Sequence, residues 1–151
     1  MGLSFFVIMR LGITGHRTFK DINPALSDRV WDILRGADIV YTGMALGFDT
    51  FIADLCYDHG IPFIACIPFI EQDAMWSDAD KAHYVTLLAA AKEIVFMASP
   101  GYAAWKYMKR NKYIVDNTDM MLAYWDGKKL GGTYQCVSYA KAQGRKVVNV
   151  Y

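Results

Sequence analysis

The feature that most restricts the fold of this chain is a regular alternation between short apolar runs and segments with helical spacing. The apolar runs are Leu11–Thr14 and the stretches ADIVYTG, IPFIACIPF, EIVFMA, DMMLAYW and KVVNVY. Between them, apolar residues recur every three or four positions, which predicts helices over Pro24–Leu34, Asp49–His59, Ser77–Ala91, Tyr102–Asn117 and Thr133–Gln143. Strands that are apolar along their whole length are buried on both faces, as in parallel sheets. The chain is therefore predicted to be α/β, with a mostly parallel sheet of about six strands and helices on both faces.

Local signals mark the ends of several predicted helices. Asn23 is placed to cap the first helix, with Pro24 at its first position. Ser77 and Asp80 have the spacing of a capping box at the start of the third helix. Glycines follow the second and fifth helices, where a glycine commonly ends a helix.

Length and composition limit the classes of function. The 151 residues suit one compact domain, predicted to span residues 1–151, and a hydrophobic fraction of 54% is enough to fill a core. The net charge of +1 gives no bulk attraction to polyanions or anionic lipids, so we expect neither nucleic acid nor a membrane as a partner. Cys56, Cys66 and Cys136 are far apart in apolar sequence and are expected to be buried, reduced thiols. We expect no bound metal and no cofactor.

We expect no targeting signal at the beginning of the chain. The apolar run Phe5–Met9 is short, follows no basic residue and precedes no small-residue cleavage site, so we expect no signal peptide. Gly2 lacks the serine or threonine that myristoylation requires four residues later, at Phe6. We therefore expect a cytoplasmic protein, and both Met1 and Met9 are candidates for its natural start.

In open α/β sheets, ligands bind at the carboxyl ends of the strands, so the loops after the strands should carry the function. The first such loop contains Gly15, His16 and Arg17. The glycine permits a sharp turn or a close approach of the backbone to a ligand, and the arginine is suited to gripping a phosphate or carboxylate. The alternative is that Arg17 is a surface arginine and His16 an ordinary loop histidine.

The second loop, TGMALGFD, leads directly into a predicted helix. Its residues Thr42, Gly43, Met44 and Gly47 precede a helix N-terminus, where free amides and the helix dipole favour an anion. Asp49 then places a negative charge near the same point. Asp49 either caps the helix or accepts hydrogen bonds from ribose hydroxyls while a phosphate lies on the neighbouring amides.

Two later loops add candidate binding residues. In the third loop, Phe69 or Trp76 could stack on a base, with Pro68 adjacent and Gln72 supplying both a donor and an acceptor. The alternative is that these aromatic side chains pack into the core. The loop after the fifth strand contributes a second glycine-rich helix start, Gly131-Gly132-Thr133, with a hydroxyl group added.

Five motifs in order resemble those of the SLOG superfamily, and its YpsA-like branch in particular. They are GITGHR, TGMALGFD, PF…Q…W, RNKYIVDNTD and GGT…YA…G, and they span Leu11 to Tyr151. The resemblance implies a Rossmann-like fold and the binding of nucleotides or nucleotide-derived ligands. The superfamily includes the LONELY GUY phosphoribohydrolases and DNA-processing protein A. The implied ligand contacts are Gly15, Arg17, Thr42, Gly43, Gly47, Asp49, Gly131, Gly132 and Thr133. Arg110, Asn111 and Asp116 match the branch without an assigned role.

One departure from the resembled hydrolases bears on activity. Their glycine-rich motif continues with two glutamates, the first of which helps to cleave the N-glycosidic bond. Alignment places Gln135 and Cys136 at these positions, and a glutamine cannot act as a general acid or base. Binding of an ADP-ribose-like or nucleoside phosphate ligand, as a sensor or carrier, is therefore favoured. An N-glycosidic-bond hydrolase or transferase, with Asp49 or Glu71 as its reactive group, is the alternative.

Two further hypotheses concern macromolecular partners. The basic run Lys106–Lys112, with interleaved aromatic residues, is either a solvated helix face or a nucleic-acid contact, and the balanced charge ranks nucleic acid last. Five aromatic residues on the predicted outer helices suggest a homo-oligomer built through helix faces. These residues are Tyr57, Tyr84, Trp105, Tyr107 and Tyr113.

Overall fold

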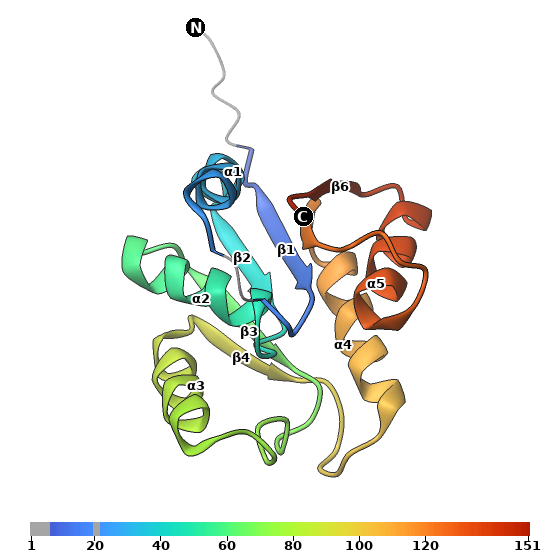
Figure 1. Cartoon of the computed structure of the whole chain (residues 1–151). Helices are drawn as coiled ribbons and strands as arrows, with labels where there is room; N and C mark the ends of the chain where they lie inside the picture. The colour runs from blue at the N-terminus through green and yellow to red at the C-terminus, as the bar shows by residue number, and fades with distance from the viewer. Residues whose placement is uncertain (1–6, 20–21) are drawn as a thin grey trace, which may run out of the picture.

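The six strands form one parallel sheet in the order β4-β3-β2-β1-β5-β6 in the computed structural model, which describes residues 7–19 and 22–151 (Figure 1). The strands are β1 (Arg10–Gly15), β2 (Ile39–Thr42), β3 (Phe63–Ile67), β4 (Glu93–Phe96), β5 (Met120–Tyr124) and β6 (Lys146–Asn149). The helices are α1 (Pro24–Leu34), α2 (Phe48–His59), α3 (Asp78–Ala90), α4 (Ala104–Asp116) and α5 (Gly131–Ala142). The predicted α/β class is thus confirmed.

The predicted helix ends have the expected physical causes. The Asn23 side chain accepts a hydrogen bond from the amide of Leu26 at 2.8 Å, and Ser77 Oγ accepts one from the Asp80 amide at 3.1 Å. Gly60 ends α2 in the left-handed conformation, with a φ of 67°. The α5 helix begins two residues earlier than predicted, because Gly131 and Gly132 already belong to its first turn.

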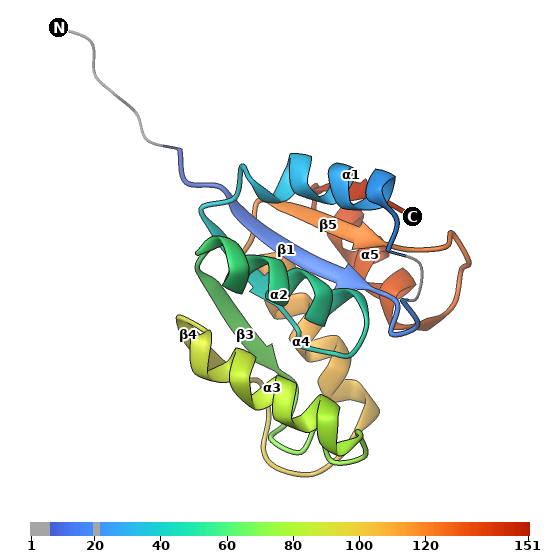
Figure 2. The ribbon, with the colours of Figure 1, turned by 60° about the vertical axis from the view of Figure 1, so that its left-hand side comes forward.

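Helices cover both faces of the sheet. Figure 2 shows α1, α2 and α3 on one side and α4 and α5 on the other. On the first side, Val30, Ile52 and Leu87 pack with Ile13 from the sheet. On the second side, the buried core contains α4 and α5 residues together with residues of β3 and β5. The three cysteines are buried free thiols, as predicted, and burial raises the pKa of the Cys56 thiol to about 12.

Two expectations about burial are corrected. The β4 strand was expected to be buried on both faces, yet Ile94 and Phe96 are exposed. This strand lies at the edge of the sheet, and the helix after it crosses to the centre of the sheet instead of covering it. Tyr84, expected on an outer surface, is only 5% exposed and belongs to the core.

The strand order creates a switch point between β1 and β5. The chain proceeds outward from β1 to β4, and α4 then returns it to β5 beside β1. The loops after β1 and β5 therefore turn toward opposite faces of the sheet, which opens a crevice between them.

None of the helices in the described residues is long and apolar enough to cross a membrane. The predictions made for residues 1–6, including part of the apolar run Phe5–Met9, lie outside the described part of the chain.

Candidate functional site

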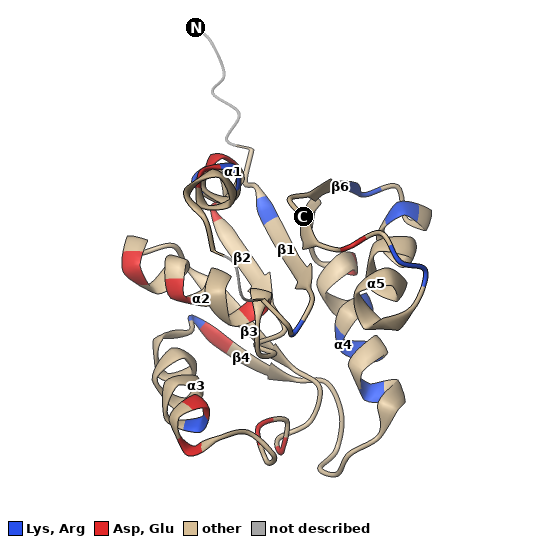
Figure 3. Ribbon diagram, viewed as in Figure 1, with Lys and Arg blue, Asp and Glu red and all other residues tan. Residues whose placement is uncertain are grey.

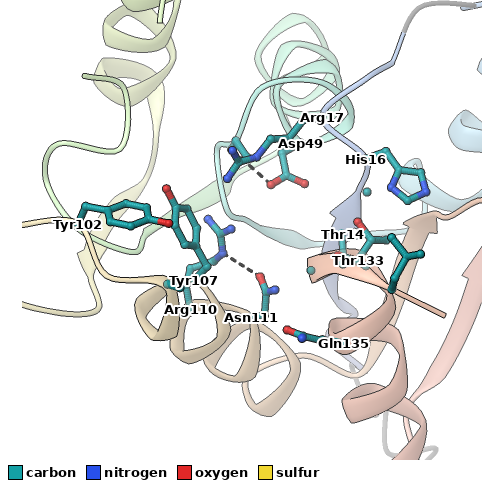
Figure 4. Close-up of a pocket in the computed structure, with 16 residues that line it drawn as sticks. Thr14, His16, Arg17, Asp49, Tyr102, Tyr107, Arg110, Asn111, Thr133 and Gln135 are labelled. Carbon is teal, nitrogen blue, oxygen red and sulfur yellow. Dashed lines mark hydrogen bonds between the residues drawn. The ribbon is translucent and has the colours of Figure 1, made fainter. Parts of the chain in front are cut away.

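A cavity of about 460 Å³ lies at the carboxyl ends of β1 and β5, at the switch point (Figure 4). The loop after β1, the flank of α4 and the start of α5 form its walls, with Asp49 from α2. Its lining residues are Thr14, Gly15, His16, Arg17, Ala45, Asp49, Tyr102, Ala104, Tyr107, Arg110, Asn111, Leu130, Gly131, Gly132, Thr133 and Gln135.

The start of α5 faces this cavity with free backbone amides. Leu130 occupies the position before the helix, and within the described residues no side chain caps this end. The first turn, Gly131-Gly132-Thr133-Tyr134, contains no acidic residue. A Cβ atom added at Gly131 or Gly132 would meet no atom of the described chain within 4 Å. The amides and the positive end of the helix dipole therefore form a site suited to an anion.

The loop after β1 supplies an exposed guanidinium group and a hydrogen-bonded imidazole. Arg17 is exposed, and its guanidinium carbon lies 5.2 Å from the centre of the Tyr107 ring. His16 Nε2 accepts a hydrogen bond from the Asp126 amide at 2.9 Å, so its other nitrogen carries the proton in the neutral ring. Figure 4 shows Arg17 beside Asp49, with His16 turned away from them.

The loop after β2, predicted to cradle a phosphate, uses part of its hydrogen-bonding capacity within the protein. Three of its amides donate within the protein. Met44 N donates to Thr42 Oγ1 at 3.3 Å, and Ala45 N donates to Asp49 Oδ2 at 3.3 Å. The helix start is closed by a bond from the Phe48 amide to the His16 carbonyl at 3.2 Å. This loop therefore offers fewer free donors to an anion than its sequence indicated, whereas no side chain among the described residues caps the start of α5.

The glycines of that loop make room for protein atoms. A Cβ at Gly43 would overlap the Arg110 guanidinium, and a Cβ at Gly47, where φ is 89°, would overlap the backbone of His16 and Arg17. Met44 is fully buried with a φ of 57°, a conformation that few side chains other than glycine adopt. Five predicted contacts line neither cavity of this region: Thr42, Gly43, Met44, Gly47 and Pro68.

Arg110 is the residue that joins these elements. It is only 5% exposed, and Nη1 donates to the Gly43 carbonyl at 2.7 Å and to Gln72 Oε1 at 3.3 Å. Its Nε donates to Asn111 Oδ1 at 2.9 Å. Gln72 Nε2 also donates to the Gly43 carbonyl, so the Gln72 amide is part of the scaffold and not a free base-reading group. Nη2 of Arg110 and Nδ2 of Asn111 are not used in these bonds and are donors available to a ligand.

Asp49 places an unusual carboxylate in the cavity. The residue is 5% exposed, and its Oδ1 atom has no hydrogen-bond partner among the residues that the structure describes. Burial raises the pKa of Asp49 to about 6, although the nearby charges of Arg110 and Arg17 and the bond from the Ala45 amide act in the opposite direction.

A second, more apolar cavity of about 760 Å³ adjoins the first and shares Arg17, Tyr102 and Tyr107 with it. Phe69 meets Tyr107 edge to face, with ring centres 5.5 Å apart. The remaining lining residues are Leu46, Glu71, Gln72, Ala74, Met75, Trp76 and Gly101. Such a cavity is suited to a planar apolar group.

The α4 helix contributes more to the site than the sequence indicated. Its basic run was interpreted as a solvated face or a nucleic-acid contact, but Lys106 and Arg110 are buried. Lys106 Nζ donates to the carbonyls of Ser99 at 2.8 Å and Gly101 at 2.6 Å, which holds the loop that carries Tyr102. Of the cavity residues missed from sequence, Ala104 and Tyr107 share a helix face with Asn111, a spacing that could have identified them.

Charge is distributed unevenly along the chain. The segment from Ala104 to Tyr151 has nine Lys and Arg residues against three Asp residues. Figure 3 shows basic residues on α4, on β6 and in the loops that flank α5, while acidic residues recur on α1, α2 and α3 of the opposite face. The net charge of +1 therefore conceals a basic C-terminal segment of the chain.

Solved structures with the same fold bear on the expected partners. DNA processing protein A of Streptococcus pneumoniae matches with a TM-score of 0.70 at 18% identity, over 93% of this chain and 49% of that one. DNA processing protein A of Helicobacter pylori matches with a TM-score of 0.64 at 17% identity, over 92% of this chain and 63% of that one. This chain thus spans about half to two thirds of those proteins.

The expectation that nucleic acid is not a partner is overturned by this comparison. The Helicobacter pylori structure is described as showing a single-stranded DNA binding mode, so a protein with this fold does bind nucleic acid. Overall net charge was a poor criterion, because attraction to a phosphate backbone depends on local charge.

Sequence comparisons identify the family. The SPbeta prophage-derived protein YoqJ of Bacillus subtilis strain 168 is 35% identical over 117 residues, which are 66% of this chain and 67% of YoqJ. The YpsA family model, described as the YspA SLOG family, matches residues 10–150. The chain therefore belongs to the YspA SLOG family.

Proposed function

We propose that this protein binds a nucleotide or nucleotide-derived ligand, as a sensor or carrier, with the ligand phosphate at the start of α5. The observation that carries the proposal is the convergence of an uncapped helix N-terminus with Arg17 and Arg110 on one cavity of about 460 Å³. Backbone amides, a helix dipole and guanidinium groups are the groups that bind phosphate in proteins.

The adjoining cavity supports a ligand that is more than an anion. Its aromatic lining suits the base of a nucleotide, and Arg17 and Tyr107 lie where the two cavities meet. A ligand with a phosphate at one end and a planar ring at the other would fill both cavities. The family membership supports the same class of ligand.

Binding is favoured over cleavage by the residue at the α5 start. Gln135 lines the cavity at the position where the resemblance places a catalytic glutamate, and an amide cannot transfer a proton as a carboxyl group does. Incubation with ribonucleoside monophosphates should therefore release no free base detectable by chromatography.

Titration calorimetry that measures the affinities of AMP, GMP, CMP, UMP, NAD and ADP-ribose tests the proposal. The affinity of each monophosphate is compared with that of its unphosphorylated nucleoside. Arg17→Ala should weaken phosphorylated ligands by about 1.5–3 kcal/mol and leave the nucleosides unchanged, since hydrogen bonds to charged groups have this magnitude. Arg35→Ala is the matched control, because Arg35 is an exposed arginine paired with Asp32. Absence of binding by every phosphorylated ligand at millimolar concentration would refute the proposal.

A single-stranded nucleic acid is a second candidate ligand. Tyr102 and Trp105 are 75% and 60% exposed, and Lys109 Nζ lies 5.9 Å from the Trp105 ring centre. Exposed aromatic rings beside basic side chains are suited to stacked bases and a phosphate backbone. The fluorescence anisotropy of a labelled oligodeoxythymidine, titrated with the protein at 50 and 200 mM salt, tests this candidate. If bases stack on Trp105, Trp105→Ala should weaken binding at both salt concentrations.

A further inference from the structure

We infer that Asp49 is a specificity-determining residue that accepts a hydrogen bond from a ribose hydroxyl, so that the site prefers ribonucleotides to deoxyribonucleotides. The inference rests on the proposed function and names the class of sugar that the site selects. It starts from the Oδ1 atom of Asp49, which is buried at the cavity without a hydrogen-bond partner among the described residues.

Capping of α2 does not explain this side chain. The residue before the helix is Gly47, and Asp49 already lies in the first helical turn. Its contact with the backbone, from the Ala45 amide, uses Oδ2. The Phe48 amide is bonded to the His16 carbonyl. The helix start is therefore satisfied without Oδ1.

An internal ion pair does not explain it either. Arg110 directs Nε and Nη1 to Asn111, Gln72 and the Gly43 carbonyl. Arg17 lies over the Tyr107 ring. In the part of the chain that the structure describes, neither arginine forms an ion pair with Asp49, although both charges act on it. Nor do the described residues include a group of three or more side chains that could hold a metal ion there.

A buried carboxylate without a partner must be compensated by a donor from the ligand or remain a net cost to folding. An ionised carboxylate only accepts hydrogen bonds and repels phosphate, so the ligand atom at Oδ1 must be a hydrogen-bond donor and cannot be a phosphate oxygen. Asp49 lines the first cavity and not the aromatic one. The part of a nucleotide that lies between its phosphate and its base is the sugar, and the vicinal hydroxyls of ribose are such donors.

The experiment measures one ratio of affinities in three proteins. Calorimetry with AMP, GMP, CMP and UMP selects the tightest probe, which is then compared with its 2′-deoxy and 3′-deoxy counterparts. The native protein should bind the ribonucleotide about 10- to 100-fold more tightly than at least one deoxy form, the range for a hydrogen bond to a charged group. In Asp49→Asn, the amide carbonyl retains the Ala45 bond and an amino group faces the cavity. The preference should fall to less than 3-fold, with affinity for the deoxy form retained.

Asp54→Asn is the control, because Asp54 lies on the same helix and pairs at the surface with His83. It should retain the native preference. Asp49→Ser provides a second variant of smaller volume if the asparagine variant fails to fold. A native protein that binds both sugars equally, or an Asp49→Asn protein that keeps the preference, would overturn the inference while leaving phosphate binding intact. Failure of all the monophosphates to bind the native protein would overturn the proposed function as well.

Discussion

The unpartnered carboxylate of Asp49 predicts that replacing this residue makes the protein more stable at neutral pH. In the native protein, folding moves Asp49 from water to a site that is 5% exposed. Burial disfavours the ionised form of Asp49 more than Arg110, the Ala45 amide and Arg17 favour it. The pKa of Asp49 therefore rises from 3.8 to about 6. Asp49→Asn removes the charge, while its amide oxygen still accepts the bond from the Ala45 amide.

The size of the effect follows from linkage between protonation and folding. The folded state binds the Asp49 proton more tightly than the unfolded state, so stability from this group is fully present below pH 3.8 and is lost as the pH rises through about 6. A pKa rise of this size, at 1.36 kcal/mol per unit, corresponds to about 3 kcal/mol lost by the native protein at pH 7. The Asp49→Asn protein does not lose this stability, because its side chain carries no charge.

Urea denaturation of both proteins at pH 4.5 and pH 7 measures the prediction. The variant should gain up to about 3 kcal/mol relative to the native protein at pH 7, and that gain should shrink by at least half at pH 4.5, where the native carboxyl is mostly protonated. The comparison between the two pH values cancels any effect of side-chain shape. A variant that is less stable than the native protein by the same amount at both pH values would refute the burial of an uncompensated charge.

The remaining predictions separate scaffold residues from ligand-facing ones. Gly43→Ala should lower the free energy of unfolding by about 1–3 kcal/mol, because its Cβ meets the Arg110 guanidinium, and urea denaturation at pH 7 would detect this loss. Gly132→Ala, whose Cβ enters open space, should change stability by less than about 1 kcal/mol yet weaken AMP binding in calorimetry. Lys106→Met should cost about 1–3 kcal/mol by leaving carbonyls of residues 99–101 unpaired, and should speed proteolysis there. Normal proteolysis in that variant would show that Lys106 does not hold the loop.

The order and type of the elements were readable from sequence because they depend on local patterns. Continuously apolar runs predicted a parallel sheet, helical spacing predicted the five helices, and Asn23 and Ser77 marked helix starts that the structure confirms. The motif order also led to the SLOG family. The α5 start was predicted as an anion site from Gly131-Gly132-Thr133, and it lies at the cavity.

Only the tertiary structure decided what each glycine-rich loop does. In sequence, the TGMALGFD loop and the GGT loop both place glycines before a helix. In the structure, Gly43 lies against Arg110 and Gly47 against the His16–Arg17 backbone, whereas Gly132 faces open space. The difference depends on which residues from distant parts of the chain pack against each loop. Arg110, 67 residues after Gly43, fills the space that the first loop leaves open.

The same reason applies to charge and to the aromatic residues. A sum over the sequence indicated a nearly neutral protein, but the fold gathers the basic segment from Ala104 to Tyr151 on one side of the molecule and places Arg110 at the cavity. The spacing of Tyr107 places it on the same helix face as Asn111, but only the α4 crossover sets that face between the two cavities. Sequence determines local conformation through neighbouring residues, whereas the binding surface is set by contacts between residues that only the strand order brings together.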